Sequence, residues 1–465
     1  MNNHRKMHTK IVCTIGPASE SKARLKKMIQ AGMTVARLNF SHGDYKSHAA
    51  LIKHIRQGAE ELGRDVGIMA DLQGPRIRVA DLSEDIKIIE GQVVYLVGDG
   101  DGKQNSPARR EAVIGVDGVG SLQFLKKGNP VFIDNGMMEL VVVGKKGAKV
   151  MCRVKVGGTV KKRKGVNIPG ISRKIGALTD VDKDNLRFAL AHDIDFVAMS
   201  FVKTARDILD LKKLIKKHLP GCSEKNLPTI IAKIETEEAV VNFDSILRVV
   251  DGVMIARGDL AIEMPLEKIP AMQKEMVTKC LHNAKPVIVA TQMLESMMEN
   301  PRPTRAEITD VANAVIDHAD ALMLSGESAM GKYPVKSVQV MAKIAQHTET
   351  GPYDDIDYGK IFIKHLVPFT LVAKAAVLMA HEMNIRNIII RNTPLAMAYK
   401  VARFRQPADI WYLTKNRHEA RRLSLVWGVR AVADAGEVQG DFVLIDGVSR
   451  ENGRIEYRIS HKIHP

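Results

Sequence analysis

Short runs of apolar residues, each closed by charged or polar ones, recur along this chain. Two of them, at 229–232 and 253–256, are followed by Lys233-Ile234-Glu235 and by Arg257-Gly258-Asp259. Runs of this length without polar alternation are typical of parallel strands that are buried on both faces. The pattern predicts two buried strands, each ending at a charged cluster.

The same signal alternates with helical periodicity over most of the chain. Strands are predicted at 10–15, 35–38, 66–70, 196–200, 229–232, 253–256, 287–290 and 321–324, and helices at 21–31, 48–62, 182–191 and 205–218. Strand and helix in alternation indicate parallel pairing. The chain has about eight such units, the number that makes up a closed (β/α)8 TIM barrel, so this fold is predicted.

The alternation breaks twice. Between about 80 and 166 it gives way to short β-like runs with glycine-rich turns, at 92–97, 131–134, 140–143 and 149–156, which predicts a small β domain inserted into the barrel. From about 351 onward, helices at 370–381, 396–404 and 418–425 alternate with strands at 385–390, 410–413 and 442–446, which predicts a small open α/β domain. The predicted domains are therefore a barrel at 1–75 and 169–345, an insertion at 76–168 and a C-terminal domain at 346–465.

Composition narrows the class of protein. A chain of 465 residues with 45% hydrophobic and 26% charged residues is typical of soluble proteins with about three domains. No window approaches the roughly 20 apolar residues of a membrane span, and no apolar signal region follows the first residues, so we expect a cytoplasmic protein without membrane contact. Four scattered cysteines argue against a disulfide framework or a structural zinc site.

The chain is basic, with a formal net charge of +16. Aromatic residues make up only 5%, and no basic stripe is interleaved with them, so we do not expect a nucleic-acid partner. An anionic small substrate, or a basic surface without a specific partner, explains the charge as well.

Polar side chains stand at the carboxyl ends of most predicted barrel strands: Arg37, Asn39, Asp71, Ser200, Lys233, Glu235, Asp259, Thr291 and Glu327. In a (β/α)8 barrel these ends share one face, so the residues are expected to form one cleft. Glu235 and Asp259 offer hard oxygen ligands for Mg²⁺ or Mn²⁺, and Lys233, two residues before Glu235, should point to the same side. A salt bridge at a strand end is the alternative reading of this cluster.

Several ordered motifs are similar to those of one family. They are TKIVCTIGPAS near the start, RLNFSHG at 37–43, DLQGPRIR at 71–78, GVNIPG at 165–170, IAKIET at 231–236, DGVMIARGDLAIE at 251–263, ATQMLESM and PTRAEITDVANAV within 290–315, and MLSGESAMGKYP at 323–334. Through these motifs the chain resembles the pyruvate kinases over nearly its whole length. The resemblance implies a barrel with an inserted β-barrel lid and a C-terminal α/β domain, commonly assembled as a homotetramer.

The implied activity is the glycolytic transfer of a phosphoryl group from phosphoenolpyruvate to ADP, giving pyruvate and ATP. By motif match, Glu235 and Asp259 would hold the divalent metal, Lys233 would neutralise the phosphoryl group and the enolate, and Arg37 would clamp the phosphate. Phosphoryl transfer needs mainly positioning and charge neutralisation, which these residue types supply.

The resemblance also implies roles around them. The backbone at Ala256, Gly258 and Asp259 would hold the substrate carboxylate, and Thr291 would shape the pyruvate pocket and help protonate the enolate carbon. The residues implied to face the nucleotide phosphates are Asn39, His42 and Arg78.

The sequence departs from the family at the monovalent-ion site. Members that need K⁺ bind it through the residues matching Asn39, Ser41, Asp71 and the carbonyl of Leu72, and carry Glu where this chain has Arg76. A guanidinium could supply the positive charge of the ion, so we expect turnover without K⁺. The alternative is that Arg76 points to solvent.

A second departure lies in the C-terminal domain. Relatives that respond to sugar phosphates carry a loop rich in Thr, Ser and Gly, whereas the matching loop here, 391–396, reads Arg-Asn-Thr-Pro-Leu-Ala. Such a loop offers few amides to a phosphate. We therefore expect no activation by fructose 1,6-bisphosphate.

Two other functions stay open from the residues alone. A metal-dependent lyase that cleaves a C–C bond through a pyruvate enolate would use the same Glu and Asp, but would not need Arg37 or Arg78. A basic binding protein with a disabled barrel is the other alternative.

Overall fold

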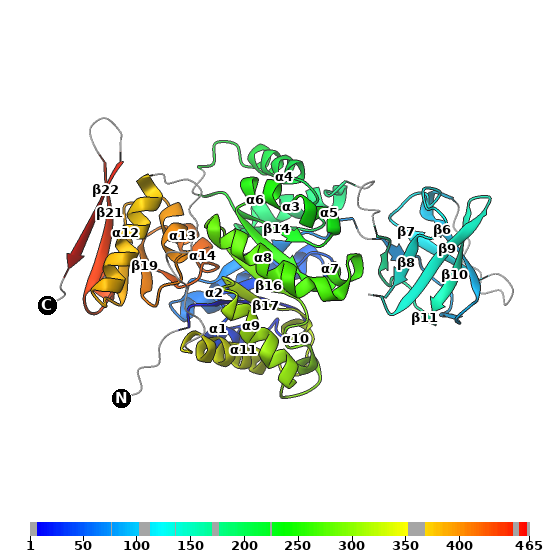
Figure 1. The fold of residues 1–465 in the computed structure, drawn as a ribbon, viewed down its shortest axis with the longest axis horizontal. Coiled ribbons are helices and arrows are strands. Elements are labelled where there is room, and N and C mark those ends of the chain that lie inside the picture. Colours follow the sequence, from blue (N-terminus) through cyan, green and yellow to red (C-terminus); the bar gives the residue numbers. More distant parts are fainter. Residues whose placement is uncertain are drawn as a thin grey trace.

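A computed structural model describes residues 7–75, 77–101, 112–134, 136–169, 176–223, 226–351, 368–449 and 455–462. Three units lie in a row (Figure 1): an all-β unit, a barrel in the centre, and an α/β unit at the opposite end. We call them the β domain, the barrel and the C-terminal domain. The three-part α/β fold predicted from the sequence is confirmed.

The barrel closes with eight parallel strands in the order β1-β17-β16-β15-β14-β13-β3-β2. The strands are β1 (Lys10–Thr14), β2 (Val35–Asn39), β3 (Gly67–Asp71), β13 (Phe196–Met199), β14 (Thr229–Ile234), β15 (Gly252–Ala256), β16 (Val287–Ala290) and β17 (Ala321–Leu324). All eight predicted strands are present.

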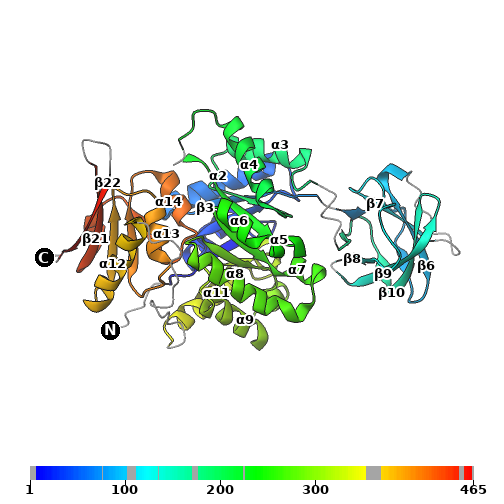
Figure 2. The same cartoon turned by 45° about the horizontal axis from the view of Figure 1, so that its top comes forward.

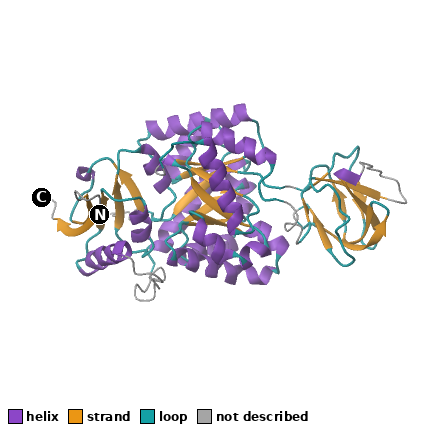
Figure 3. Ribbon diagram, turned by 90° about the horizontal axis from the view of Figure 1, so that it is seen from above, coloured by secondary structure: helices purple, strands orange, loops and turns teal. Residues whose placement is uncertain are grey.

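Both faces of these strands are covered. Alternate residues point inward and form a cluster inside the barrel that includes Val12, Met69 and Phe196. The residues between them, such as Ile11 and Cys13, pack outward against the helices, which ring the strands in Figure 3. This two-sided burial explains why the strands read as continuous apolar runs.

Helices connect the strands and shield the outer face. They are α1 (Lys22–Ala31), α2 (Tyr45–Glu61), α3 (Asp180–Ala191), α4 (Ala205–His218), α5 (Glu237–Val241), α6 (Phe243–Val249), α7 (Arg257–Glu263), α8 (Ile269–His282), α9 (Arg305–Ile316), α10 (Gly326–Ala329) and α11 (Pro334–Glu349). Helix α2 begins three residues before the predicted 48, because Asp44 and Ser47 form a capping box at its start.

The β domain leaves the barrel after β3 and stands apart from it in Figure 2. Its seven-stranded sheet has the order β12-β8-β9-β10-β6-β7-β4, and β11 pairs with β5. The strands are β4 (Arg78–Val79), β5 (Ile86–Ile88), β6 (Val93–Gly98), β7 (Ala112–Asp117), β8 (Pro130–Ile133), β9 (Met138–Lys146), β10 (Lys149–Val156), β11 (Gly158–Val160) and β12 (Val166–Asn167). Its core is separate from that of the barrel, as expected for an inserted domain.

The C-terminal domain has a five-stranded sheet in the order β20-β19-β18-β21-β22, in which only β22 runs antiparallel to its neighbour. Its elements are α12 (Pro368–Glu382), β18 (Asn387–Arg391), α13 (Ala396–Ala402), β19 (Asp409–Leu413), α14 (Arg417–Leu423), β20 (Val429–Val432), β21 (Phe442–Ser449) and β22 (Ile455–Lys462). The strands β20 and β22 were not predicted.

The C-terminal domain covers the amino-terminal end of the barrel. Leu425 belongs to the apolar cluster inside the barrel. Asp320, just before β17, accepts hydrogen bonds from Arg405 Nη2 (2.7 Å) and from the backbone N–H of Trp427 (3.1 Å). This end of the barrel is therefore closed, and the carboxyl ends of the strands lie at the other end. None of the described helices is long and apolar enough to cross a membrane.

Candidate active site

The carboxyl ends of β3 and β14, which β13 separates in the barrel, bring three predicted site residues into direct contact. Lys233, near the end of β14, places its Nζ 3.1 Å from Asp71 Oδ1 and 2.8 Å from Glu235 Oε1. All three side chains are buried. The expectation that Lys233 and Glu235 point to the same side is confirmed.

Arg37 completes this charged group. Its Nε donates to Asp71 Oδ2 over 2.6 Å, and its Nη1 donates to Thr14 Oγ1 over 2.8 Å. Within the described residues these two bonds hold the guanidinium and leave Nη2 for another acceptor. Arg37 and Lys233 therefore flank Asp71, one on each carboxylate oxygen.

Mutual attraction fixes the charge states of this group. Burial alone would raise the pKa of Asp71, but the charges of Lys233 and Arg37 outweigh burial and hold that pKa below its ordinary value. Burial alone would lower the pKa of Lys233, but the charges of Asp71 and Glu235 outweigh it and raise that pKa. Lys233 is therefore a permanent cation at neutral pH, as neutralisation of an anionic substrate requires.

Backbone and hydroxyl groups anchor the two acids and the lysine. The N–H of Phe201 donates to Glu235 Oε2 over 2.7 Å, from a residue whose φ is +52°. The hydroxyl of Ser200 accepts from Lys233 Nζ (2.7 Å) and donates to the carbonyl of Leu72 (2.7 Å). The site is thus preorganised by the loops that follow β3 and β13.

Thr291 lies at the end of β16 with a φ of +72°, in the left-handed region that a β-branched residue rarely adopts. Its hydroxyl accepts from the N–H of Gly258 (2.7 Å) and donates to the carbonyl of Ala290 (2.6 Å). A Cβ at Gly258 would lie 3.3 Å from the Thr291 hydroxyl, so glycine permits this close approach. Strain of this kind is typical of functional sites.

The Arg257 guanidinium supports the strained turn at Thr291. Arg257 donates through Nη2 to the carbonyl of Thr291 (2.8 Å) and through Nη1 to Asp310 Oδ1 (2.7 Å). Asp259 follows in the first turn of α7, and its charge is among those that raise the pKa of Lys233. Asp259, which follows β15, is therefore close enough to Lys233 to interact with it electrostatically.

The remaining predicted residues have other environments. Glu327 accepts from the N–H groups of Leu294 (3.1 Å) and Ser325 (2.7 Å), and burial raises its pKa. Glu327 thus links the loop after β16 to the loop after β17, which is a structural role. The carbonyl of His42 is 2.9 Å from His48 Nε2, and Arg78 lies on β4 of the β domain.

The residues predicted for a monovalent ion include Asn39 and Asp71, which are partners in the register of β2 and β3. Asn39 Oδ1 accepts from the N–H of Ser41 over 3.1 Å, and the Ser41 hydroxyl is buried without a hydrogen-bond partner among the described residues. The carbonyl of Leu72 already accepts from Ser200. Arg76 lies outside the described residues.

Two acids could hold a divalent ion. No group of three or more His, Cys, Asp or Glu side chains that could hold a metal occurs among the described residues. If Glu235 and Asp259 hold such an ion, they supply two hard oxygen ligands and water and substrate oxygens supply the rest, which is how proteins often hold Mg²⁺. Glu235 Oε1 lies 2.8 Å from Lys233 Nζ, so this acid already has a cationic neighbour.

Two partners of the site were missed from the sequence. Thr14, which orients Arg37, ends β1 and could have been found by extending the search for polar strand ends to the first strand. The pairing of Arg257 with Asp310 joins residues far apart in the chain, and no local pattern indicates it.

Comparisons with known proteins agree with this geometry. The family model described as pyruvate kinase, barrel domain, matches residues 6–338, and the model for the pyruvate kinase alpha/beta domain matches residues 370–452. A pyruvate kinase of Staphylococcus haemolyticus is 39% identical over 96% of this chain and 75% of its own length. One from Geobacillus stearothermophilus is 40% identical over 91% and 71%.

A solved structure is also similar. The crystal structure of a pyruvate kinase from Cryptosporidium parvum superposes with a TM-score of 0.89 at 32% identity, covering 100% of this chain and 98% of that one. Fold, motifs and similarity thus agree along the whole chain. The chain belongs to the pyruvate kinase family and is a phosphotransferase.

Proposed function

We propose that this protein transfers the phosphoryl group of phosphoenolpyruvate to ADP, giving pyruvate and ATP. The observation that carries the proposal is the buried Lys233 ammonium group, held between Asp71 and Glu235 at the carboxyl end of the barrel with Arg37 beside it. Two fixed cations suit a substrate that carries a phosphate and develops an enolate.

In this proposal Arg37 binds the phosphate of phosphoenolpyruvate through Nη2, because Nε and Nη1 are already used to orient the guanidinium. Lys233 neutralises the charge that moves from the phosphoryl group to the enolate oxygen. The proposed residues for the nucleotide phosphates are Asn39, His42 and Arg78, with the β domain closing over them as a lid.

The substrate carboxylate is proposed to lie at the backbone of Ala256, Gly258 and Asp259. The N–H of Gly258 now donates to Thr291 Oγ1, so the carboxylate would exchange with that hydroxyl. Once released, the Thr291 hydroxyl could orient a water that protonates the enolate carbon. The strained backbone of Thr291 keeps the hydroxyl at this place.

A divalent ion, Mg²⁺ or Mn²⁺, would be held by Glu235 and Asp259. When bound it supplies positive charge to the phosphoryl and enolate oxygens. The anchoring of Glu235 by the N–H of Phe201 supports this role, because it fixes the carboxylate in direction.

The test of this function is a coupled assay on the purified protein. We expect pyruvate to form from phosphoenolpyruvate only when ADP and a divalent ion are both present, and a chelator to stop the reaction until the ion is restored. A C–C lyase would release pyruvate from a larger keto acid without ADP. ADP-independent pyruvate formation would therefore refute the proposal.

We further propose that turnover does not require K⁺. The oxygens of Asp71 are already matched by Lys233 and Arg37, so the acid adds little negative charge for a monovalent ion. Against this proposal stands the Ser41 hydroxyl, which is buried without a hydrogen-bond partner among the described residues and which such an ion would satisfy. In buffer with Na⁺ or tetramethylammonium in place of K⁺ we expect kcat within about twofold of the K⁺ value, as positive charge from Arg76 would replace the ion. A rate that collapses without K⁺ and returns with it would contradict this.

We also propose that fructose 1,6-bisphosphate does not activate this enzyme through the 391–396 loop. Arg391 is paired with Asp446, and Asn392 Nδ2 donates to the same acid over 3.0 Å. The loop's cation is therefore neutralised within the domain. We expect phosphoenolpyruvate saturation curves with and without fructose 1,6-bisphosphate to superimpose; a curve shifted to lower substrate concentration would show that the loop does bind the sugar phosphate.

Assembly as a homotetramer is proposed on the family resemblance. Sedimentation velocity would distinguish a tetramer from a monomer.

A further inference from the structure

The turn after β16 contains two consecutive residues with positive φ angles, Thr291 at 72° and Gln292 at 54°. Neither is glycine and the first is β-branched, so the backbone of this turn is strained. A strained conformation persists only where its surroundings enforce it. In the proposed function the Thr291 hydroxyl orients the water that protonates the enolate carbon. Whatever holds the turn therefore also holds a group that takes part in the reaction.

The Arg257 guanidinium contacts three consecutive residues of this turn. Its Nη2 lies 2.8 Å from the carbonyl oxygen of Thr291 and 3.5 Å from that of Gln292. The same nitrogen lies 2.8 Å from the sulfur of Met293, whose side chain is buried. Hydrogen bonds from a charged donor are about twice as strong as those between neutral groups, so this contact opposes relaxation of the turn.

The guanidinium is itself fixed by side chains of α8 and α9. Asp310 of α9 holds it as a fork, with Oδ1 2.7 Å from Nη1 and Oδ2 2.7 Å from Nη2. Gln273 of α8 is 2% exposed, and its Oε1 lies 3.4 Å from Nη1. A bidentate pair of this kind sets the orientation of the guanidinium plane as well as its position. Arg257 is therefore a rigid link between two helices and the turn after β16.

The contact from Arg257 differs in one respect from the other contact to Thr291. The N–H of Gly258 donates to Thr291 Oγ1 over 2.7 Å, and in the proposed function this N–H turns to the substrate carboxylate. The bond from Arg257 goes to the Thr291 carbonyl instead and uses no group assigned to the carboxylate. It is therefore the contact that continues to hold the turn while substrate is bound.

We propose that Arg257, fixed by Asp310, is a positioning residue for protonation of the enolate carbon, an inference that rests on the proposed function. In this step the enolate oxygen regains its carbonyl double bond, and the carbon–carbon π electrons form a C–H bond with a proton of the water held by Thr291. That water takes a proton back from solvent. Phosphoryl transfer to ADP depends on Lys233 and Arg37 instead. Loss of Arg257 therefore slows protonation much more than phosphoryl transfer.

Two measurements on the full-length protein separate these steps. Exchange of the methyl protons of pyruvate for deuterium, followed by proton NMR in D₂O with Mg²⁺ and ATP present, reports proton transfer at the carbon. ATP formed from phosphoenolpyruvate and ADP in the first turnover, measured by rapid quench, reports phosphoryl transfer. We expect Arg257→Leu to slow the exchange by about 10²-fold, the scale for a reacting group displaced by about 1 Å, and first-turnover ATP formation by less than about threefold.

Two further variants grade the effect. Arg257→Lys keeps the charge but not the fork, so it should recover part of the exchange rate that Arg257→Leu loses. Asp310→Asn keeps the shape of the acid and leaves Arg257 in place without its ionic partner, so it should slow the exchange less than Arg257→Leu does. Asp310→Asn also provides the test if Arg257→Leu does not fold.

Arg187→Leu is the matched control. Arg187 is 63% exposed and pairs with Asp184 on the surface of α3, with 2.9 Å between Nη1 and Oδ1. This variant loses an arginine and an ion pair as Arg257→Leu does, but away from the turn. Both the exchange rate and first-turnover ATP formation should equal those of the wild type.

The outcomes distinguish this inference from the proposed function. A wild type that forms no pyruvate from phosphoenolpyruvate and ADP would refute the proposed function itself. With an active wild type, equal slowing of exchange and ATP formation in Arg257→Leu would reduce Arg257 to a general structural role and refute the inference. Unchanged exchange in this variant would refute it too, and so would an active wild type that exchanges no methyl protons of pyruvate.

A crystal structure of the Arg257→Leu variant tests the cause directly. We expect the Thr291 backbone to leave the left-handed region and its hydroxyl to move away from the N–H of Gly258. A turn that keeps its positive φ angles without the guanidinium would show that other contacts enforce it, and would overturn the proposal.

Discussion

Replacing Lys233 by methionine is expected to lower kcat for ADP-dependent pyruvate formation by about 10³-fold, the scale seen when a preorganised charge-stabilising group is removed from an active site. Methionine keeps the length of the side chain but removes the ammonium group that contacts both Asp71 and Glu235. The enolate oxygen would then develop next to two carboxylates. A smaller effect on the KM for phosphoenolpyruvate is expected, because Arg37 remains to bind the phosphate.

The measurement is steady-state kinetics in a coupled assay, with circular dichroism to establish that the variant is folded. Lys332→Met is a matched control, because Lys332 is 64% exposed and pairs with Glu299 on the outside of the barrel. It should keep the wild-type kcat. A folded Lys233→Met enzyme with kcat within tenfold of the wild type would remove Lys233 from the proposed chemistry.

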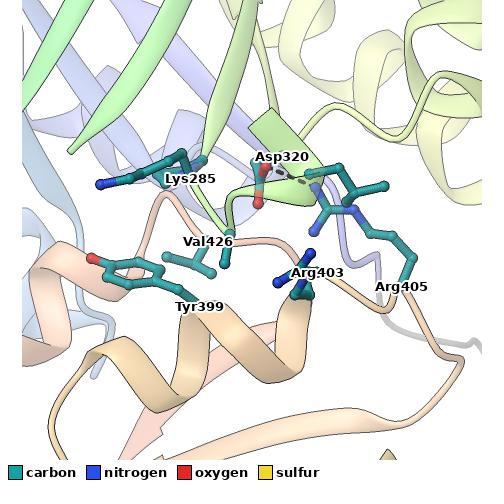
Figure 4. A pocket seen from close by; sticks show the side chains of 9 residues that line it. Lys285, Asp320, Tyr399, Arg403, Arg405 and Val426 are labelled. Atoms are coloured by element: carbon teal, nitrogen blue, oxygen red, sulfur yellow. Dashed lines mark hydrogen bonds and ion pairs between the residues drawn. The ribbon is translucent and has the colours of Figure 1, made fainter. Parts of the chain in front are cut away.

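The largest effect on stability is expected for Asp320→Ala, which should lower the free energy of unfolding by about 3–5 kcal/mol. The Asp320 carboxylate accepts hydrogen bonds from Arg405 (Figure 4), from the N–H of Val287 and from the N–H of Trp427, at the junction of the barrel with the C-terminal domain. Its removal leaves the Arg405 guanidinium, whose side chain is 3% exposed, without its carboxylate partner. The cost is mainly that of the stranded charge.

Denaturant unfolding followed by fluorescence in a Trp411→Phe background, which leaves Trp427 of the chain's two tryptophans, measures this change at the junction itself. Asp180→Ala is the comparison, because Asp180 is 94% exposed and pairs with Lys183 on the surface, where such pairs contribute at most about 1 kcal/mol. An Asp320→Ala variant that unfolds like the Asp180→Ala variant would mean that Arg405 finds another partner or water.

Most of the barrel could be predicted because its strands are buried on both faces and read as apolar runs. The polar residues of the site could be predicted because they directly follow these runs, at the carboxyl ends of the strands. The apolar run at 229–232 ends at Lys233, and the structure places this lysine on the same rim as Arg37 and Asp71. The rule that carboxyl ends share one face needs no knowledge of distances. It found five residues of the central charged group, including Glu235 and Ser200.

The strands that were missed lack that signal. β20 has only four residues and a charged one, Arg430, in the middle. β22 alternates Ile455, Tyr457 and Ile459 with polar residues, but it is a sheet edge whose side chains are largely exposed, so few apolar residues mark it. Both depend on partners elsewhere in the sheet rather than on local preference.

Contacts between side chains far apart in the chain could not be predicted from the sequence either. Asp71 was assigned from the resemblance to a monovalent ion, and the structure gives it Lys233 and Arg37 as direct partners. A sequence shows which groups stand at an edge, but it does not show which of them saturate one another.

The closure of the barrel has a consequence for the synthesis of this protein on the ribosome. Its first strand pairs with its last, and the bond from Thr14 to Leu324 joins residues 310 positions apart. At translation rates of roughly 5–20 residues per second, β1 waits roughly 15–60 s for its neighbour to emerge. During that interval one edge of a strongly apolar strand is open to aggregation, so nascent chains are expected to depend on chaperones until residue 324 leaves the exit tunnel.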